Sequence, residues 1–382
     1  MAERSVVVLG AGIGGTVAAR ILRKRLPADV RVILVDRDAS FTFVPSLLWL
    51  LSGERTRAKL TRGRERLARA GIDVVTDLAE GLDPDARTIR VGGRDVSYER
   101  VVVALGAEPV PDLMPGLARG ALNIYSPEGA LKAGQALREL DGGRVAVVIA
   151  KPPYKCPAAP NEAAFLAEAL LRRRGIRAQV ALFTPEPYPM PTAGEALGTA
   201  LAGMIRARGI ELHTGAILEE VDPDANQLAF QGGEREHYDL LLAIPPHRTA
   251  EVVRTSGLAN DSGFIPVDPA TLATQSPHVS AIGDVTQIPI AGGKFLPKAG
   301  VFANAQALVV AARIADELAG REPTATFDGH GACFVDMGDG VAAFATGDFY
   351  APDGPSVSLR RPSRRWRLAK AGLERWWLAR WA

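Results

Sequence analysis

The two cysteines of this 382-residue chain, Cys156 and Cys333, are its most prominent candidates for redox or nucleophilic chemistry. Cys156 lies in KPPYKCPAAP, between the apolar run RVAVVIA and the helix-like run NEAAFLAEALL. A thiol just before a helix gains thiolate character from the helix dipole, and we expect Lys151 and Lys155 to add to it. Cys333 begins the aromatic-rich segment CFVDMGDGVAAFATGDFY. These unusual settings favour reactive thiols over the alternative, inert buried ones.

The segment around Cys156 takes the place of a phosphate-binding loop. The strand RVAVVIA, the helix NEAAFLAEALLRRRG and the strand RAQVALFTPEP form an α/β unit of the nucleotide-binding type. In such a unit, glycine amides after the first strand bind a pyrophosphate. Here that turn contains four prolines, which lack amide protons, so Glu186 after the second strand has no phosphate loop beside it. We therefore expect no NAD(P)H binding in the usual manner, and a different electron donor.

The N-terminal residues carry an intact nucleotide-binding pattern. Gly10, Gly12 and Gly15 form G-x-G-x-x-G between the strand SVVVL and a helix-like run. The first glycine permits the turn, the second lets the backbone approach a pyrophosphate, and the third lets the helix pack on the strand. The next strand, RVILVD, ends in Asp36, 21 residues after Gly15, where a carboxylate can bind ribose hydroxyls. The pattern fits both FAD and NAD.

Two later segments favour FAD. YERVVVALGAEPV, residues 98–110, resembles the strand and small-residue turn of two-dinucleotide-fold flavoproteins. HVSAIGDVTQIP places Gly283 and Asp284 after a strand, and it resembles the motif whose aspartate contacts the flavin ribityl chain. Either segment alone is also typical of a plain buried strand and turn. Their order after the glycine pattern predicts FAD.

Composition limits the class of protein. The chain is 47% hydrophobic and 23% charged with a formal net charge of +2, which is typical of a soluble protein of two or three domains. Two cysteines exclude a disulfide framework and favour a reducing compartment. We find no signal-peptide pattern and no apolar run of about 20 residues, and we expect a location on the cytoplasmic side. The five histidines show no metal-ligand spacing, so no metal is expected.

The last 23 residues, RRPSRRWRLAKAGLERWWLARWA, differ from the rest of the chain because they hold eight basic residues and four tryptophans. On a helix, their apolar residues fall close to one stripe: Trp366, Ala369, Leu373, Trp376, Trp377 and Trp381. This pattern is typical of a helix that lies in a membrane interface. The alternative is a terminal helix packed on its own domain, and nothing else in the chain favours nucleic-acid binding.

Taken together, these segments resemble the sulfide:quinone oxidoreductase and flavocytochrome c sulfide dehydrogenase family. The resemblance extends nearly end to end, through VVVLGAGIGG, FTFVPSLLWLLSG, VVVALGA, PPYKCPAAPNEAAF, TPEPYPMP, AIGDV, PKAGVFANAQA and ACFVDMGDGVAAFATGDFY. The cysteine–proline segment is the most specific of these. The resemblance implies an α/β protein with two Rossmann-like dinucleotide-binding domains, of the glutathione-reductase-like FAD/NAD(P)-binding fold, and a C-terminal membrane and quinone-contact segment. We expect the FAD-binding domain in residues 1–108 and 246–320, a second Rossmann-like domain without the NAD glycine loop in 109–245, and the quinone-pocket and membrane-anchoring segment in 321–382.

The resemblance also implies the activity and the site residues. Sulfide, or a small persulfide or thiol, would be oxidised at a Cys156/Cys333 redox pair to sulfane sulfur or polysulfide, and FAD would pass two electrons to a membrane quinone. Lys298 matches a family lysine near the flavin pyrimidine edge, and Pro45 matches a residue close to the isoalloxazine. The candidate cofactor-binding residues are Gly10, Gly12, Gly14, Gly15, Asp36, Arg37, Pro45, Ala79, Gly106, Gly283, Asp284, Lys298 and Ala299. The candidates for stacking a quinone ring are Phe302, Phe334 and Phe349, with plain core packing as the alternative.

The chain departs from the family pattern in two places. Many bacterial members carry a third cysteine in the segment that here reads ALNIYSPEGA, which leaves the polysulfide length and the sulfur acceptor open. The flavocytochrome branch attaches FAD to an N-terminal-domain cysteine, and since no cysteine precedes Cys156 we expect non-covalent FAD. Alternatives are a type II NADH:quinone dehydrogenase, a cytochrome-linked sulfide dehydrogenase and a flavin-binding thiol redox sensor. We expect a peripheral, monotopic membrane protein, and a homo-oligomer stays open.

Overall fold

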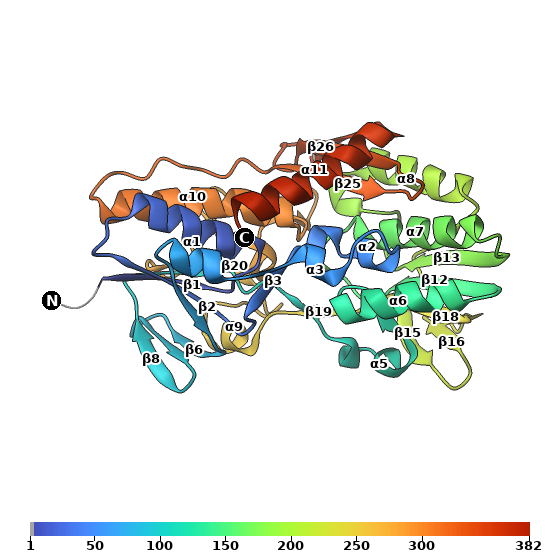
Figure 1. Cartoon of the computed structure of the whole chain (residues 1–382), viewed down its shortest axis with the longest axis horizontal. Helices are drawn as coiled ribbons and strands as arrows, with labels where there is room; N and C mark the ends of the chain where they lie inside the picture. Colours follow the sequence, from blue (N-terminus) through green and yellow to red (C-terminus); the bar gives the residue numbers. More distant parts are fainter. Residues whose placement is uncertain (1–3) are drawn as a thin grey trace.

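Two five-stranded parallel sheets lie side by side along the long axis of the computed structural model, which describes residues 4–382 (Figure 1). The first has the strand order β21-β9-β1-β2-β5. Its strands are β1 (Ser5–Leu9), β2 (Arg31–Asp36), β5 (Asp73–Thr76), β9 (Arg100–Val103) and β21 (Val279–Ala281), with α1 (Ile13–Arg25) and α10 (Gly300–Leu318) packed together beside them. The valine-rich runs of β1 and β9 are buried, as a covered parallel sheet requires. This confirms the predicted strand–turn–helix at the N-terminus.

The second sheet has the order β11-β18-β12-β13-β14 and is also parallel. Its strands are β11 (Leu122–Asn123), β12 (Gly143–Ile149), β13 (Ala178–Thr184), β14 (Glu211–Thr214) and β18 (Leu240–Ile244), and its helices are α6 (Pro127–Glu139), α7 (Ala159–Arg173) and α8 (Glu195–Ala207). β12, α7 and β13 confirm the predicted α/β unit around Cys156. The strands of the two sheets fall inside the predicted domain ranges, whose boundaries stay a prediction.

The other elements before the C-terminal segment are short, and their strands form small sheets separate from the two five-stranded ones. The remaining helices are α2 (Leu48–Leu51), α3 (Arg57–Leu60), α4 (Glu65–Arg69), α5 (Leu117–Gly120) and α9 (Glu251–Thr255). The remaining strands before the C-terminal segment are β3 (Ser40–Thr42), β4 (Thr61–Gly63), β6 (Ala79–Asp83), β7 (Thr88–Val91), β8 (Arg94–Ser97), β10 (Glu108–Pro109), β15 (Leu218–Asp222), β16 (Gln227–Phe230), β17 (Arg235–His237), β19 (His247–Arg248), β20 (Ile265–Pro266), β22 (Thr286–Gln287), β23 (Pro289–Ile290) and β24 (Lys294–Phe295).

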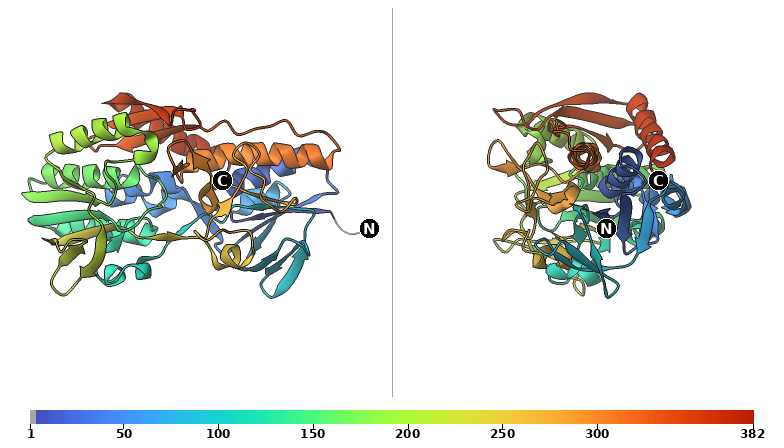
Figure 2. Two further views of the ribbon diagram at one scale, coloured as in Figure 1. Left: turned by 180° about the vertical axis from the view of Figure 1, so that it is seen from behind. Right: turned by 90° about the vertical axis from the view of Figure 1, so that its left-hand side faces the viewer.

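The C-terminal segment forms a three-stranded antiparallel sheet followed by a long helix. The strands are β25 (His330–Asp336), β26 (Ala342–Asp348) and β27 (Ser356–Ser363), and the helix is α11 (Arg364–Arg380). α11 runs over the junction between the two halves, and the C-terminal strands lie on the same side of the molecule as α10 (Figures 1 and 2). None of the helices in residues 4–382 is both long and apolar enough to cross a bilayer.

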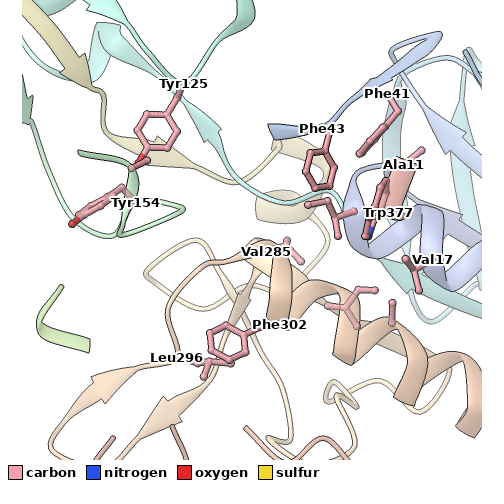
Figure 3. Packing of buried hydrophobic residues seen from close by; sticks show 14 of the residues in the cluster. Ala11, Val17, Phe41, Phe43, Tyr125, Tyr154, Val285, Leu296, Phe302 and Trp377 are labelled. Carbon is pink, nitrogen blue, oxygen red and sulfur yellow. The ribbon is translucent and has the colours of Figure 1, made fainter. Parts of the chain in front are cut away.

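One face of α11 packs on the protein through aromatic contacts. The Trp377 ring lies 4.9 Å from the Phe41 ring and 5.3 Å from the Phe43 ring (Figure 3), and its indole nitrogen donates to Asn304 Oδ1 at 3.1 Å. Trp381 is also buried. The predicted single apolar stripe of the tail is therefore wrong in part, because its tryptophans divide between a packed face and an exposed face.

The exposed face of α11 carries large apolar side chains. Leu368 is 72% exposed, Trp376 54% and Leu373 43%, among basic residues of the same helix. Exposed apolar side chains of this size on a cationic helix are typical of a surface that meets another phase or partner. The structure thus combines features of both the interfacial helix and the packed terminal helix.

Buried ion pairs connect α11 to α7 and β25. Lys370 Nζ lies 2.5 Å from Glu162 Oε1 on α7, and Arg367 lies 2.8 Å from Asp336 on β25. Glu162 also accepts the Asp336 backbone N–H at 2.6 Å. Because breaking one partner of a buried ion pair leaves an uncompensated charge, these contacts fix the position of the helix.

We predict that Trp377→Ala lowers the free energy of unfolding by about 3–5 kcal/mol, because it leaves a cavity beside Phe41 and Phe43. The matched control is Trp376→Ala on the exposed face, which should change it by less than about 0.5 kcal/mol. Urea unfolding followed by circular dichroism measures both. Equal losses for the two variants would contradict this packing of α11.

Candidate active site

A cavity of about 730 Å³ lies where the first sheet, the Cys156 loop, β25 and α11 meet. It is lined by every predicted cofactor-binding residue except Gly15, and by Cys156, Cys333 and Phe334. A Cβ at Gly15 would lie 1.7 Å from the Gly10 carbonyl oxygen, so this glycine stands at the contact between helix and strand. The residues that the sequence predicted for cofactor binding and thiol chemistry thus line one cavity, Gly15 excepted.

The glycine turn at one end of the cavity lets a ligand approach the backbone closely. Gly10 has φ +94°, and a Cβ there would lie 2.5 Å from the Ala104 carbonyl oxygen. Gly12 precedes the first turn of α1, and a Cβ there would meet no atom within 4 Å. Since Gly12 lines the cavity, that Cβ would take up space that a bound phosphate needs.

Asp36 is held at the end of β2 by contacts to both of its carboxylate oxygens. Its Oδ2 accepts the Ala11 backbone N–H at 2.5 Å, and its Oδ1 lies 3.1 Å from the buried guanidinium of Arg64. Arg64 also donates to the Ala11 carbonyl at 3.3 Å, which links the acid to the glycine turn. Sequence reasoning missed Arg64, because it stands in the arginine-rich run TRGRERLARA with no feature that sets it apart.

Asp284 lines the cavity and carries an acceptor oxygen, the buried Oδ1, that lacks a hydrogen-bond partner among the described residues. Burial raises the pKa of this carboxyl, and the charges of Lys155 and Lys298 counteract the rise. A buried acceptor without a donor is costly, and a ligand hydroxyl would satisfy it. The orphaned oxygen and the glycine turn both fit FAD, whose ribityl hydroxyls and pyrophosphate supply the matching groups.

The Cys156 loop is fastened to Lys298, which also lines the cavity. The Cys156 backbone N–H donates to the Lys298 carbonyl at 2.6 Å, and Lys155 forms a parallel β-bridge with Lys298. Cys156 has φ +52°, which is uncommon outside glycine and clusters at functional sites. Tyr125, in the segment ALNIYSPEGA, donates its hydroxyl to the Cys156 carbonyl at 3.1 Å.

Both cysteines are free thiols on the wall of the same cavity. Burial raises the pKa of Cys156 to about 12 and also raises the pKa of Cys333. The expected thiolate character of Cys156 is therefore wrong, since desolvation and the nearby Glu162 carboxylate outweigh the groups that lower its pKa. Lys151 is exposed, and the cation that most strongly opposes the rise is Lys370 of α11.

A buried charged pair lies beside the thiols. Glu162 and Lys370, 2.5 Å apart, both line the cavity. Burial raises the pKa of Glu162, and Lys370 opposes the rise. Sequence reasoning missed both residues. The signal for Glu162 is an acid six residues after Cys156 on the buried face of α7, whereas Lys370 resembles any of the eight basic residues of the tail.

The three predicted quinone-contacting phenylalanines do not lie together. Phe334 lines the cavity, along with Phe344 and Leu373. Phe302 and Phe349 are buried against each other with ring centroids 5.0 Å apart and are not among the lining residues; Figure 3 shows Phe302 within the packed core. Their geometry favours the alternative interpretation, core packing.

The second nucleotide half-site is closed by its own side chains. Tyr154, from the loop that stands in place of the phosphate turn, is 5% exposed, and its hydroxyl donates to Glu186 Oε2 at 2.9 Å. Thr184 donates to the same oxygen at 3.3 Å. Figure 3 shows Tyr154 turned inward near Tyr125. The carboxylate that would bind a nucleotide ribose thus already has protein partners.

The family profile described as pyridine nucleotide-disulphide oxidoreductase matches residues 4–307. The chain belongs to this family. It is 26% identical over 361 residues to the mitochondrial sulfide:quinone oxidoreductase of Mus musculus, covering 91% of this chain and 78% of the relative. It is 25% identical over 362 residues to the sulfide-quinone reductase of Aquifex aeolicus, covering 89% and 83%. The crystal structure of the Aquifex aeolicus sulfide:quinone oxidoreductase superposes with a TM-score of 0.89 at 24% identity, covering 98% of this chain and 91% of that chain.

Family membership and the cavity together make the protein an FAD-dependent oxidoreductase with the predicted two-dinucleotide-fold architecture. The cavity extends from the glycine turn to the two cysteines, so one bound FAD can reach both its phosphate contacts and the thiols.

We predict that Gly12→Ala folds normally but binds FAD at least about tenfold more weakly, because the added methyl projects into the phosphate end of the cavity. The matched control is Gly203→Ala on the exposed side of α8, where a Cβ also meets no atom within 4 Å. Titration of the apoproteins with FAD, followed by flavin fluorescence, measures the affinities. Wild-type affinity in Gly12→Ala would contradict the placement of the pyrophosphate.

Proposed function

We propose that the protein is a sulfide:quinone oxidoreductase that oxidises sulfide, or a small persulfide or thiol, at Cys156 and Cys333. The observation that carries the proposal is that the loop in place of a phosphate turn brings Cys156 to the FAD cavity, and β25 brings Cys333 to the same cavity. The named sulfide oxidoreductases of Mus musculus and Aquifex aeolicus, similar along most of this chain, support it.

The thiol chemistry follows from sulfur exchange. HS⁻ attacks a disulfide or sulfur bridge between Cys156 and Cys333, so that one cysteine becomes a persulfide and the other leaves as a thiolate. Re-forming the bridge with the added sulfur atom releases two electrons and one proton, which FAD, when bound, would accept before passing the electrons to the quinone. The same acceptors would oxidise the free thiols of Cys156 and Cys333 to the first bridge.

Proton handling falls to the charged pair beside the thiols. Burial holds the pKa of Cys156 near 12, so at neutral pH this residue is a protonated thiol. It reacts as a thiolate only when a nearby base takes its proton or a nearby cation stabilises the negative charge. Lys370 supplies the positive charge, and Glu162 offers a carboxyl whose raised pKa suits proton exchange. Both line the cavity.

The quinone is proposed to enter beside α11. Leu373 and Trp376 line the cavity and are 43% and 54% exposed, and Val44 beside them in the lining is 45% exposed. Apolar residues that are both exposed and part of the lining give an apolar ligand a route that avoids water. With the basic residues of α11, this face suits peripheral contact with an anionic bilayer surface.

We predict that Cys156→Ser and Cys333→Ser each lower sulfide-dependent reduction of a short-chain quinone by at least about 100-fold, because sulfur exchange needs both thiols. FAD content should stay at the wild-type level, since neither sulfur occupies the phosphate end of the cavity. Anaerobic steady-state assays measure the rate. Unchanged turnover in both variants, or turnover with NADH in place of sulfide, would contradict the proposal.

We predict that Leu368→Glu combined with Trp376→Glu releases the protein from vesicles of mixed anionic and neutral phospholipid, because it places two negative charges on the exposed face of α11. The matched control is Leu113→Glu, which changes a side chain that is 48% exposed and far from α11 in the sequence. Co-sedimentation measures the bound fraction. Equal binding of the α11 variant and the control would argue against a membrane role for this helix.

A further inference from the structure

Two lysines flank Asp284 in the cavity, and they differ in what their ammonium groups already contact. Lys298 Nζ donates to the Asp284 and Thr286 carbonyls at 2.9 and 3.0 Å and lies 3.6 Å from the Phe264 ring centroid. An ammonium has three donor hydrogens, so most of the donor capacity of Lys298 is committed to holding the protein wall.

The ammonium of Lys155 makes fewer hydrogen bonds than that of Lys298. Its Nζ makes one hydrogen bond within the described residues, to the Ala107 carbonyl at 3.3 Å, and its side chain lines the cavity. Glu108, the acid next to Ala107, is already paired with Arg37 at 2.7 Å. Lys155 therefore has spare donors and faces the same space as Cys156, the residue that follows it.

The charge of Lys155 is incompletely compensated. Burial lowers its pKa, and the nearby carboxylates of Asp284 and Glu108 offset this only in part. A buried cation with incomplete compensation is stabilised when a negative charge arrives close to it. In a cavity that holds FAD, such a charge arrives when two electrons and one proton convert neutral oxidised flavin into its singly negative reduced form.

We propose that Lys155 is a charge-stabilising residue of the flavin site, whose ammonium favours reduced over oxidised flavin. The lysine forms no bond and transfers no proton in this role; it acts through its charge. The inference rests on FAD binding and the position of Lys155, and it does not depend on sulfide or quinone being the substrates.

The position has a structural consequence for the loop that replaces the phosphate turn. The β-bridge between Lys155 and Lys298 fixes the backbone of the loop beside the cavity, which both Lys155 and Cys156 line. The loop would then supply two functions at once: Cys156 as one of the two thiols of the site, and Lys155 as the charge that makes the flavin a better electron acceptor.

The test uses the FAD-loaded Lys155→Met protein, titrated with dithionite and a reference dye. We expect the equilibrium between reduced and oxidised flavin to move at least about tenfold toward oxidised flavin, which is about 30 mV lower in midpoint potential for a two-electron couple. Binding of sulfite, whose flavin adduct also carries negative charge, should weaken by a similar factor. Lys151→Met, on the exposed side of the loop, is the matched control and should leave both quantities unchanged.

Two further variants serve as a replacement and as a rescue control in this test. Lys155→Gln retains a donor for the Ala107 carbonyl and replaces Lys155→Met if that variant does not fold, while Lys155→Arg should restore the wild-type potential. A wild-type potential and sulfite affinity in the neutral variants would overturn the proposal. Loss of FAD from both neutral variants, with retention by Lys155→Arg, would also overturn it, because the charge would then serve cofactor binding instead of reduction.

Discussion

The hydrogen bond from the Cys156 amide to the Lys298 carbonyl is the contact on which the site depends. It joins the loop after β12, a strand of the second parallel sheet, to the segment before α10, which packs beside the first sheet. Without it the prolines would stiffen the loop but would not set its position relative to the cavity. With it, Cys156 and Lys155 line the same cavity as Asp284.

Burial determines the electrostatics of this site. It raises the pKa of both cysteines and of Glu162, and it lowers the pKa of Lys298 to about 8. Each group is therefore less charged than it would be in water, and each gains when a neighbour or ligand of opposite charge is close. The pair Glu162–Lys370 meets this need within the protein, and it depends on α11 being packed in place.

The sequence predicted the parts of this site that follow local rules. Gly12 and Asp36 occur at fixed distances from a strand and a helix, so the nucleotide end of the cavity could be named in advance. Lys370 and Arg64 could not, because each is one of many basic residues in its segment and only tertiary packing selects it. The pKa of Cys156 was misjudged for the same reason: the helix dipole is visible in a sequence, whereas the degree of burial is not.

The division of the tail tryptophans shows the same limit. A helical period places Trp376 and Trp377 close together, yet Phe41 and Phe43, more than 300 residues earlier, bury only Trp377. The exposed remainder of α11 is what connects the fold to the proposed membrane contact.

The most direct test of the account is anaerobic titration of the FAD-loaded protein with sulfide and, separately, with NADH, following the flavin absorbance near 450 nm, about where oxidised flavin absorbs. The account predicts that about one equivalent of sulfide bleaches the flavin and that NADH leaves it oxidised, since Tyr154 already occupies the carboxylate of Glu186. Rapid bleaching by NADH with no response to sulfide would contradict it.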